Sequence, residues 1–296
     1  MQSKVLVLMA AYNGNKWIVE QIESILNQED VDVSICVSVD KSSDGTERII
    51  HDLSLKYNNI SYLPFGEVFG GAAKNFFRLI LEADVQKFDY IAFADQDDIW
   101  FADKLRRAVS VLNEYDFYSS NVTAFWNDGR KIDVIKSQPM VKYDYVFEAG
   151  GPGCTYVIRK DVFFKLKYFI ENNKDQVLSL YLHDWFVYAF ARSNNFTWFI
   201  DDRSSMLYRQ HENNQVGANN SLKSFLKRFK LIQKKWYRTE IEKLIAVLSL
   251  RDDPFLNKAL YNGYFGNLYL AVNIAKLRRR KRDRFLLMFA LLINIF

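Results

Sequence analysis

The sequence of 296 residues is 49% apolar and 25% charged, which is the composition of a globular protein and excludes a disordered or collagen-like chain. Its two cysteines, Cys36 and Cys154, exclude a disulfide scaffold and are typical of a reducing compartment. The net charge of +5 is uneven, because residues 221–296 carry 17 Lys and Arg against 5 Asp and Glu, and the rest carries 23 against 30. This asymmetry predicts chemistry in the acidic first part and attachment to something anionic through the basic last part.

Strands and helices are predicted to alternate over roughly the first 95 residues. Continuous apolar runs, typical of strands buried on both faces, alternate with apolar stripes at helical spacing. The runs lie at 5–9, 33–39, 60–65 and 90–94, and the stripes at 15–27, 44–57 and 73–83. This order predicts an α/β fold with right-handed βαβ units and a mostly parallel sheet flanked by helices. A ligand is then expected beyond the carboxyl ends of the strands.

The remaining chain is predicted to be less regular and then helical. Shorter strands and loops are expected at 120–160, a helix at 179–192, strands at 196–200 and 206–208, and a linker at 213–220. From residue 222 the chain is expected to be helical and basic, which predicts two domains, 1–215 and 216–296. The first 12 residues lack the pattern of a signal peptide, and no apolar run reaches 18 residues. We therefore expect a cytoplasmic protein without a transmembrane helix.

An acidic cluster follows the strand predicted at 90–94, in the segment 94–100 with the sequence ADQDDIW. Asp95 and Asp97 are expected to point in similar directions, because side chains alternate along an extended chain. Carboxylates this close repel one another unless a cation joins them, and hard divalent cations prefer oxygen ligands. The segment therefore predicts a metal that bridges to a diphosphate. The alternative is an acidic turn in which one aspartate caps a helix that starts near Phe101.

Two further strand ends carry residues suited to a nucleotide. Asp40 follows the run 33–39, and its carboxylate can accept hydrogen bonds from a nucleobase or a ribose. The neighbouring Asp44 and Gly45 are explained by a helix cap and a tight turn, which leaves Asp40 as the candidate. The segment 70–75, GGAAKN, precedes a helix and can bring backbone N–H groups close to an anion. A flexible loop before a helix is the alternative for this segment.

Asp184 and His211 are two more candidates. Asp184 lies near the start of a predicted helix beside aromatic residues, where it can act as a general base if it opens to a cleft. The alternative is an aspartate that complements the helix dipole. His211, in the segment 208–214 with the sequence YRQHENN, is a candidate metal ligand or diphosphate donor. The alternative is an ordinary loop histidine.

The end of the chain combines a basic cluster with an apolar segment. Residues 278–284 have the sequence RRRKRDR, and only Asn294 is polar in the twelve residues 285–296. Twelve residues are too few to span a bilayer, but the pattern is typical of a helix on an anionic membrane surface. The apolar end disfavours a nucleic-acid partner, and none is expected. The alternative is a helix packed on its own domain or on a partner subunit of a homo-oligomer.

In combination, these segments resemble family 2 of the inverting glycosyltransferases, which have the nucleotide-sugar-binding GT-A fold. The matching segments are 9–14 (MAAYNG), 39–46 (VDKSSDGT), 71–75 (GAAKN) and 94–98 (ADQDD), in order at successive strand ends. The resemblance covers about residues 3–212 and leaves out the basic tail. The sequence DQDDIW, with the later YRQH and paired asparagines, is most similar to the bacterial rhamnosyltransferase-like branch that builds cell-surface polysaccharides.

The resemblance implies the residues of a nucleotide-sugar site. Ala11, Asn13 and Asp40 would line the nucleoside pocket, with Asp40 accepting a hydrogen bond from a pyrimidine base. Lys74 stands where the family usually has a basic residue near the base. The other residues implied near the nucleotide sugar or the acceptor are Asp95, Gln96, Gly150, Gly151 and Gly153.

The resemblance also implies a metal site and a catalytic base. Asp95 and Asp97 would hold a divalent manganese or magnesium ion, and His211 resembles a third ligand found in some members. Asp184 would be the base, although the family more often has Glu-Asp where this chain has His183-Asp184. The implied reaction is a single displacement in which Asp184 deprotonates an acceptor hydroxyl and the metal stabilises the leaving nucleoside diphosphate.

The implied function is the transfer of a sugar at the inner face of the cell membrane. The donor expected from the branch is dTDP-rhamnose, otherwise a UDP-hexose, and the acceptor is a hydroxyl of a glycan or a lipid-linked glycan. A sugar nucleotidyltransferase is an alternative, but the first strand is not followed by the Gly-rich basic loop that such an enzyme needs. A non-catalytic membrane-bound nucleotide-binding scaffold is another, although it has no need for the acidic cluster or the base.

Overall fold

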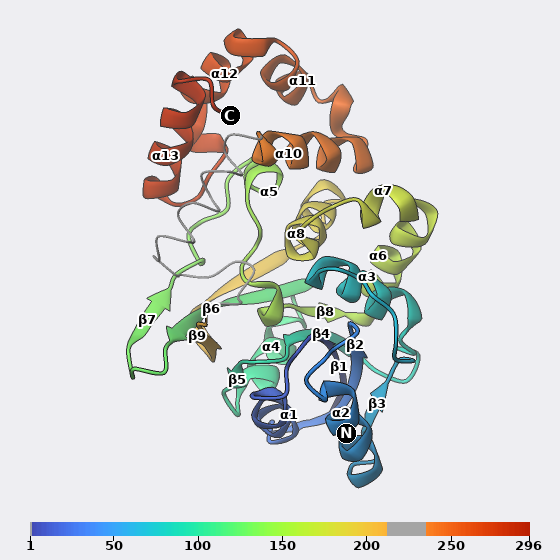
Figure 1. Cartoon of the computed structure of the whole chain (residues 1–296). Coiled ribbons are helices and arrows are strands. Elements are labelled where there is room, and N and C mark those ends of the chain that lie inside the picture. The colour runs from blue at the N-terminus through green and yellow to red at the C-terminus, as the bar shows by residue number, and fades with distance from the viewer. Residues whose placement is uncertain (1, 212–234) are drawn as a thin grey trace.

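The computed structural model describes residues 2–211 and 235–296 (Figure 1). The described strands form one nine-stranded sheet in the order β3-β2-β1-β4-β8-β6-β9-β5, with β7 paired to β6. These strands are β1 (Ser3–Ala11), β2 (Val31–Val39), β3 (Ile60–Tyr62), β4 (Tyr90–Asp95), β5 (Ile99–Trp100), β6 (Phe117–Phe125), β7 (Lys131–Val134), β8 (Val157–Arg159) and β9 (Trp198–Arg209).

Helices cover both faces of this sheet, and a group of C-terminal helices lies at one end of the molecule (Figure 1). The helices are α1 (Ile18–Leu26), α2 (Thr46–Lys56), α3 (Ala72–Glu82), α4 (Lys104–Val111), α5 (Asp144–Phe147), α6 (Lys160–Asn172), α7 (Lys174–Leu178), α8 (His183–Ser193), α10 (Trp236–Val247), α11 (Pro254–Leu260), α12 (Gly263–Val272) and α13 (Lys281–Leu292). The α/β fold class expected from the sequence is thereby confirmed.

The first four strands make the parallel half of the sheet. β1 pairs in parallel with β2 and β4, and β2 pairs in parallel with β3. The side chains of β1 alternate between two apolar cores, with Leu6 and Leu8 on the side of α3 and with Val7 and Met9 on the side of α1. Burial on both faces explains the continuous apolar run of β1 and confirms the prediction made from it.

The second half makes the sheet mixed rather than mostly parallel. β8 pairs antiparallel to β4 and β6, β7 antiparallel to β6, and β5 antiparallel to β9, while β6 and β9 are parallel. The two strands expected at 196–200 and 206–208 are one strand, β9. Its polar middle stays in the sheet because the buried carboxylate of Asp201 accepts hydrogen bonds from Arg107 Nη2 at 2.8 Å and from Tyr118 Oη at 2.9 Å.

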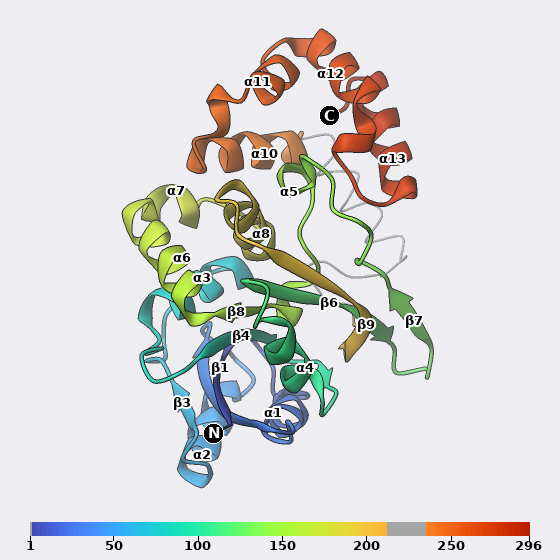
Figure 2. The same ribbon diagram turned by 180° about the vertical axis from the view of Figure 1, so that it is seen from behind.

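Of the C-terminal helices, α10 lies next to α5 in both views, and α11 and α12 lie farther from the sheet (Figure 2). Apolar side chains of α10, including Ile241 and Leu244, belong to the same core cluster as Phe77 of α3 and Phe186 of α8. The apolar core therefore continues from the sheet into the helical region that the sequence predicts. The linker expected at 213–220 and the domain boundary between 215 and 216 lie outside the described residues, and the division into two domains stays a prediction.

The basic cluster 278–284 divides into inward and outward side chains. Arg278 donates to the carbonyl oxygen of Phe147, and Arg279 is buried, whereas Arg280, Lys281 and Arg282 are exposed. Helix α13 begins within the cluster, at Lys281, and leaves part of its apolar surface uncovered. No helix in the described part of the chain is long and apolar enough to cross a membrane.

The packing of α3 on α8 generates the first prediction. Phe77 is fully buried, and its ring meets the edge of Phe186 with ring centroids 5.7 Å apart. Phe77→Ala removes these contacts and leaves a cavity, so we expect the free energy of unfolding to fall by about 3–5 kcal/mol in urea denaturation. Leu55→Ala on α2 is the control, because Leu55 is 73% exposed and its truncation should cost less than about 0.5 kcal/mol. Equal losses in the two variants would contradict this packing.

Candidate active site

The ends of β1 and β2 meet through hydrogen bonds between their loops. The carbonyl oxygen of Ala11 accepts from the backbone nitrogen of Asp40 at 2.8 Å. The backbone nitrogen of Asn13 donates to Ser42 Oγ at 3.0 Å, and Asn13 Oδ1 accepts from the backbone nitrogen of Ser43 at 2.9 Å. The structure thus brings together the three residues expected around a nucleoside, Ala11, Asn13 and Asp40.

The carboxylate of Asp40 fixes the glycine loop that precedes α3. Asp40 Oδ1 accepts from the backbone nitrogen of Phe69 at 2.9 Å, and Oδ2 accepts from that of Gly70 at 3.0 Å. A carboxylate has about four acceptor positions, so these two bonds leave room for a further donor. Lys74 is exposed on the first turn of α3, beside this loop.

Gln96 holds the β1–α1 loop. Its Oε1 accepts from the backbone nitrogen of Tyr12 at 2.6 Å, and its Nε2 donates to the carbonyl oxygen of Tyr12 at 2.7 Å. A Cβ atom on Gly14 would collide with the Gln96 amide, which explains the glycine at that position. Gln96 therefore bonds to the loop beside the predicted nucleoside pocket, with both ends of its amide engaged.

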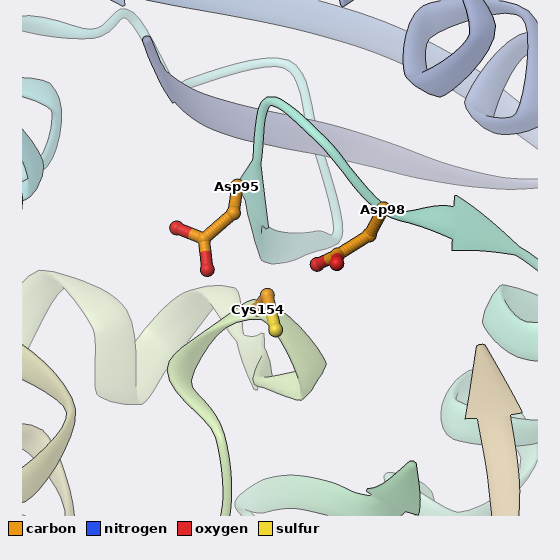
Figure 3. Close-up of side chains that lie close together, drawn as sticks. All are labelled: Asp95, Asp98 and Cys154. Carbon is orange, nitrogen blue, oxygen red and sulfur yellow. The ribbon is translucent and has the colours of Figure 1, made fainter. Parts of the chain in front are cut away.

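Carboxylates crowd together where β4 ends. Asp95 and Asp98 face the turn that carries Cys154, and the three side chains offer ligand atoms within 4.8 Å of one another (Figure 3). Burial, together with the charges of Asp97 and Asp184, raises the pKa of Asp95 to about 7. Burial and the charges of Asp97 and Asp95 also raise the pKa of Asp98, whose Oδ2 has no hydrogen-bond partner among the described residues. A divalent cation bound here would stabilise the charged forms of Asp95 and Asp98 and lower their pKa values.

Asp97 points to a different partner. Its Oδ2 lies 2.6 Å from Nε2 of His211, and the His211 ring stacks on Trp17 with ring centroids 4.4 Å apart. The structure therefore brings two of the three expected metal ligands into contact and places the third, Asp95, in the adjoining cluster. The alternative, in which an aspartate of the cluster caps the next helix, is not observed. Helix α4 starts at Lys104, and its N-cap residue is Asp103, which lies outside the cluster.

Arg209 ties this turn to the end of β9. Its backbone nitrogen donates to Asp98 Oδ1 at 3.0 Å, and its Nε donates to the carbonyl oxygen of Asp97 at 2.7 Å. Its guanidinium also pairs with Glu20 of α1 at 2.5 Å. Because one side chain contacts the acidic turn and α1 together, Arg209 fixes both Asp97 and Asp98 relative to the sheet.

Asp184 is the second residue of α8 and is partly exposed. Its Oδ1 accepts from the backbone nitrogen of Trp185 at 2.8 Å. Burial raises its pKa to about 6, and the charge of Lys136 opposes that shift. A carboxylate that titrates near neutral pH suits proton transfer from a hydroxyl.

The glycines that are expected near the sugar pack against residues of α8. A Cβ atom on Gly150 would lie 2.7 Å from Tyr188 and 2.9 Å from Trp198, so only glycine fits there. A Cβ atom on Gly153 would lie 2.6 Å from His183 Nε2 and 3.1 Å from the Asp184 side chain. The hydroxyl of Tyr156 lies 3.2 Å from the carbonyl oxygens of both Gly151 and Asp184 and joins the loop to the helix.

His183, the residue before Asp184, is uncharged and lies close to Gly153. Its ring stacks on Phe76 with centroids 3.9 Å apart. Burial lowers the pKa of His183 to about 3, so the ring is neutral at pH 7. Its Nε2 has no hydrogen-bond partner in residues 2–211 and 235–296.

Two residues of the site were not singled out from the sequence. Cys154 borders the acidic cluster, and burial raises its pKa well above the ordinary value, so it stays a thiol. Lys104 lies buried beneath the cluster, where its Nζ donates to the carbonyl oxygen of Cys154 at 3.1 Å, and burial lowers its pKa to about 8. Lysines are usually exposed, so nothing in the sequence distinguished Lys104 from a surface residue of a helix.

Two solved structures share this architecture at low sequence identity. TarS 1–349 of S. aureus, in complex with UDP-GlcNAc, superimposes with a TM-score of 0.56 at 16% identity, covering 99% of this chain and 88% of TarS 1–349. The mannosyltransferase PcManGT of Pyrobaculum calidifontis, in complex with GDP-Man and Mn2+, gives 0.52 at 14% identity, covering 100% of this chain and 86% of its own. These likenesses show the GT-A fold. Fold and site together define a sugar transferase of the GT-A class.

The sequence identifies the family within that class. The pattern of Glycosyl transferase family 2 matches residues 6–172. The dTDP-rhamnosyl transferase RfbG of Shigella flexneri is 50% identical over 291 residues, which is 97% of this chain and 100% of RfbG. The chain belongs to glycosyl transferase family 2, and both the expected family and the expected rhamnosyltransferase-like branch are confirmed.

The clamp made by Gln96 generates the second prediction. Gln96→Ala removes two hydrogen bonds to Tyr12 and is expected to lower the free energy of unfolding by about 1–2 kcal/mol in chemical denaturation. The matched control is Gln86→Ala, since the side chain of Gln86 is exposed and should contribute less than about 0.5 kcal/mol. An unchanged stability of Gln96→Ala would show that the clamp does not hold the loop in solution.

Proposed function

We propose that this chain transfers rhamnose from dTDP-rhamnose to a hydroxyl of a glycan or lipid-linked glycan in bacterial surface polysaccharide synthesis. The 50% identity to a dTDP-rhamnosyl transferase over 97% of the chain supports this donor. The observation that carries the proposal is the convergence of the strand-end carboxylates with Asp184: Asp95 and Asp98 lie close to Cys154, and the preceding residue, Gly153, packs against Asp184. A displacement at a sugar carbon needs a charge-stabilising group on the leaving side and a base on the attacking side.

The donor nucleotide would lie against the joined ends of β1 and β2. Ala11 and Asn13 would line the pocket, and Asp40 would accept a hydrogen bond from the pyrimidine through the acceptor positions that its loop bonds leave free. Lys74 would add a positive charge near the nucleotide from the first turn of α3. Gln96 would act through the loop that it holds, and Gly151 would leave space for the sugar.

Asp95, Asp97 and His211 would hold a manganese or magnesium ion, with Asp98 as a further carboxylate within reach. These oxygen and imidazole donors suit such a cation, whereas sulfur is a soft donor that manganese and magnesium do not favour, so Cys154 is left out of the ligand set. When bound, the ion would stabilise the negative charge that develops on the leaving diphosphate. The mannosyltransferase of the same fold binds Mn2+, which supports this choice.

Asp184 would take the proton of the acceptor hydroxyl as its oxygen attacks the anomeric carbon. Attack from the face opposite the leaving diphosphate gives one displacement and inverts the configuration. Burial lowers the pKa of the neighbouring His183 to about 3, so its ring is a weaker base than Asp184 and does not compete for the proton. The family membership favours this transferase over the nucleotidyltransferase and scaffold alternatives.

The apolar C-terminal face, which consists of the exposed residues Phe285, Leu286, Phe289, Leu292 and Ile293, would attach the protein to an anionic membrane at the inner face of the cell membrane. Four of these residues lie on α13, where their spacing gathers them on one side. The exposed cations Arg280, Lys281 and Arg282 precede them and suit anionic head groups. This location would bring the site to a lipid-linked acceptor.

The donor and the metal are tested together by thermal-shift binding. We expect dTDP with Mn2+ to raise the Tm of the wild type, because ligands that bind only the folded state stabilise it. Asp97→Ala should abolish the part of the shift that depends on Mn2+. Asp128→Ala, which removes an exposed carboxylate outside the site, is the control. A shift with UDP but not with dTDP would assign a UDP-sugar donor, and no shift with either would contradict the proposed donor site.

The role of Asp184 is tested by turnover and by pH. Asp184→Asn should keep nucleotide binding and lower kcat by about 100-fold or more, because it removes the base. The wild-type kcat should fall as the pH drops through about 6, since the base acts in its deprotonated form. Asp175→Asn on α7 is the control for loss of an exposed carboxylate. A near-wild-type kcat of Asp184→Asn would remove this residue from the mechanism.

Membrane attachment is tested by vesicle flotation. We expect the wild type to float with vesicles of phosphatidylglycerol and phosphatidylcholine, and less so in high salt, because salt screens the basic residues. The double variant Phe285→Ser and Phe289→Ser should lose binding, whereas Leu55→Ser, at an exposed apolar residue of α2, should not. Flotation that is equal in all three proteins, or absent in the wild type, would favour a face covered by protein.

A further inference from the structure

Arg279 belongs to the basic cluster that the sequence pattern assigns to an anionic surface, yet its side chain is fully buried. Its backbone nitrogen donates to Glu148 Oε1 at 2.6 Å, and its Nη2 donates to the carbonyl oxygen of Ala149 at 2.6 Å. Its Nη1 donates to the hydroxyl of Tyr188 at 3.1 Å. A residue next to the membrane-facing helix α13 is therefore bonded to the segment before Gly150 and to α8.

Two short chains of contacts connect Arg279 to the proposed base, Asp184. Along the loop, Ala149 is followed by Gly150, which packs against Tyr188, and by Gly151, whose carbonyl oxygen shares the Tyr156 hydroxyl with that of Asp184. Along the helix, Tyr188 lies four residues after Asp184, so the two side chains project from the same side of α8.

The charges around Arg279 show that it does more than fill space. Glu148 Oε2 lies 3.6 Å and Asp144 Oδ2 3.5 Å from its guanidinium. Asp144 has a second partner, since Arg192 Nη1 lies 2.9 Å from its Oδ1. Removing Arg279 would leave Asp144 paired, but it would free the carbonyl of Ala149 and one donor to Tyr188. The loss should therefore loosen the loop rather than unfold the core.

We infer that Arg279 is a positioning residue, which holds loop 148–153 in place beside Asp184 and so makes the C-terminal helical region part of the catalytic unit. The inference rests on the proposed role of Asp184. A guanidinium suits this role, because its planar fork donates to the Ala149 carbonyl and the Tyr188 hydroxyl at once, a geometry that the ammonium of lysine reproduces only in part.

The test compares Arg279→Gln and Arg279→Lys with Arg251→Gln, which removes an exposed cation from the same helical region. Since small displacements of reacting groups are costly, we expect Arg279→Gln to lower kcat by about 10- to 100-fold and to leave the dTDP-induced Tm shift unchanged. Arg279→Lys should recover part of the loss, and Arg251→Gln should match the wild type. Hydrogen exchange of residues 148–156 should be faster in Arg279→Gln alone.

Tyr188→Phe keeps the ring against Gly150 and removes only the hydroxyl, so it serves if Arg279→Gln does not fold. It should lower kcat and speed exchange in the same segment. The inference is overturned if exchange of 148–156 is unchanged in the folded variants, or if kcat falls only in step with the nucleotide-induced Tm shift. A wild type that transfers no rhamnose would refute the proposed donor instead, and the exchange measurement would still decide the role of Arg279.

Discussion

The structure depends on the crowding of three carboxylates at the end of one buried strand. Asp95, Asp97 and Asp98 are held together although burial and mutual repulsion raise the pKa of the first and the last. Such an arrangement persists only when the surroundings enforce it. Arg209 of β9 bonds to the turn and also pairs with Glu20 of α1, and the buried ammonium of Lys104 lies beneath the turn. These contacts keep negative charge at the place where we propose that a metal and a diphosphate bind.

The two ends of the site are built by different parts of the chain. The proposed nucleotide side is made by loops after β1, β2 and β4, which bond directly to one another. The proposed acceptor side is made by loop 148–153 and α8, which pack on helices from the end of the sequence. A shared apolar core joins the two sides, so the helical region is better described as a wall of the enzyme than as an appendage.

The sequence allowed the parallel half of the fold and most of the site to be predicted, because these depend on local patterns. Buried strands give continuous apolar runs, and Asp40, Asp95 and Asp97 follow them directly. The polar middle of β9 was wrongly predicted to interrupt the strand, because its pairing with Arg107 joins residues far apart in sequence. The burial of Arg279 was missed for the same reason, since a run of cations does not reveal which of them finds a buried partner.

The bonds of Asp40 have a consequence for the energetics of nucleotide binding. Its carboxylate accepts from the backbone nitrogens of Phe69 and Gly70, and these bonds fix the loop before α3. A nucleobase that meets a preorganised acceptor does not have to order that loop or strip a mobile carboxylate of water. Binding enthalpy is then available for affinity rather than for folding the pocket, and the entropy lost on binding should fall mainly on the nucleotide.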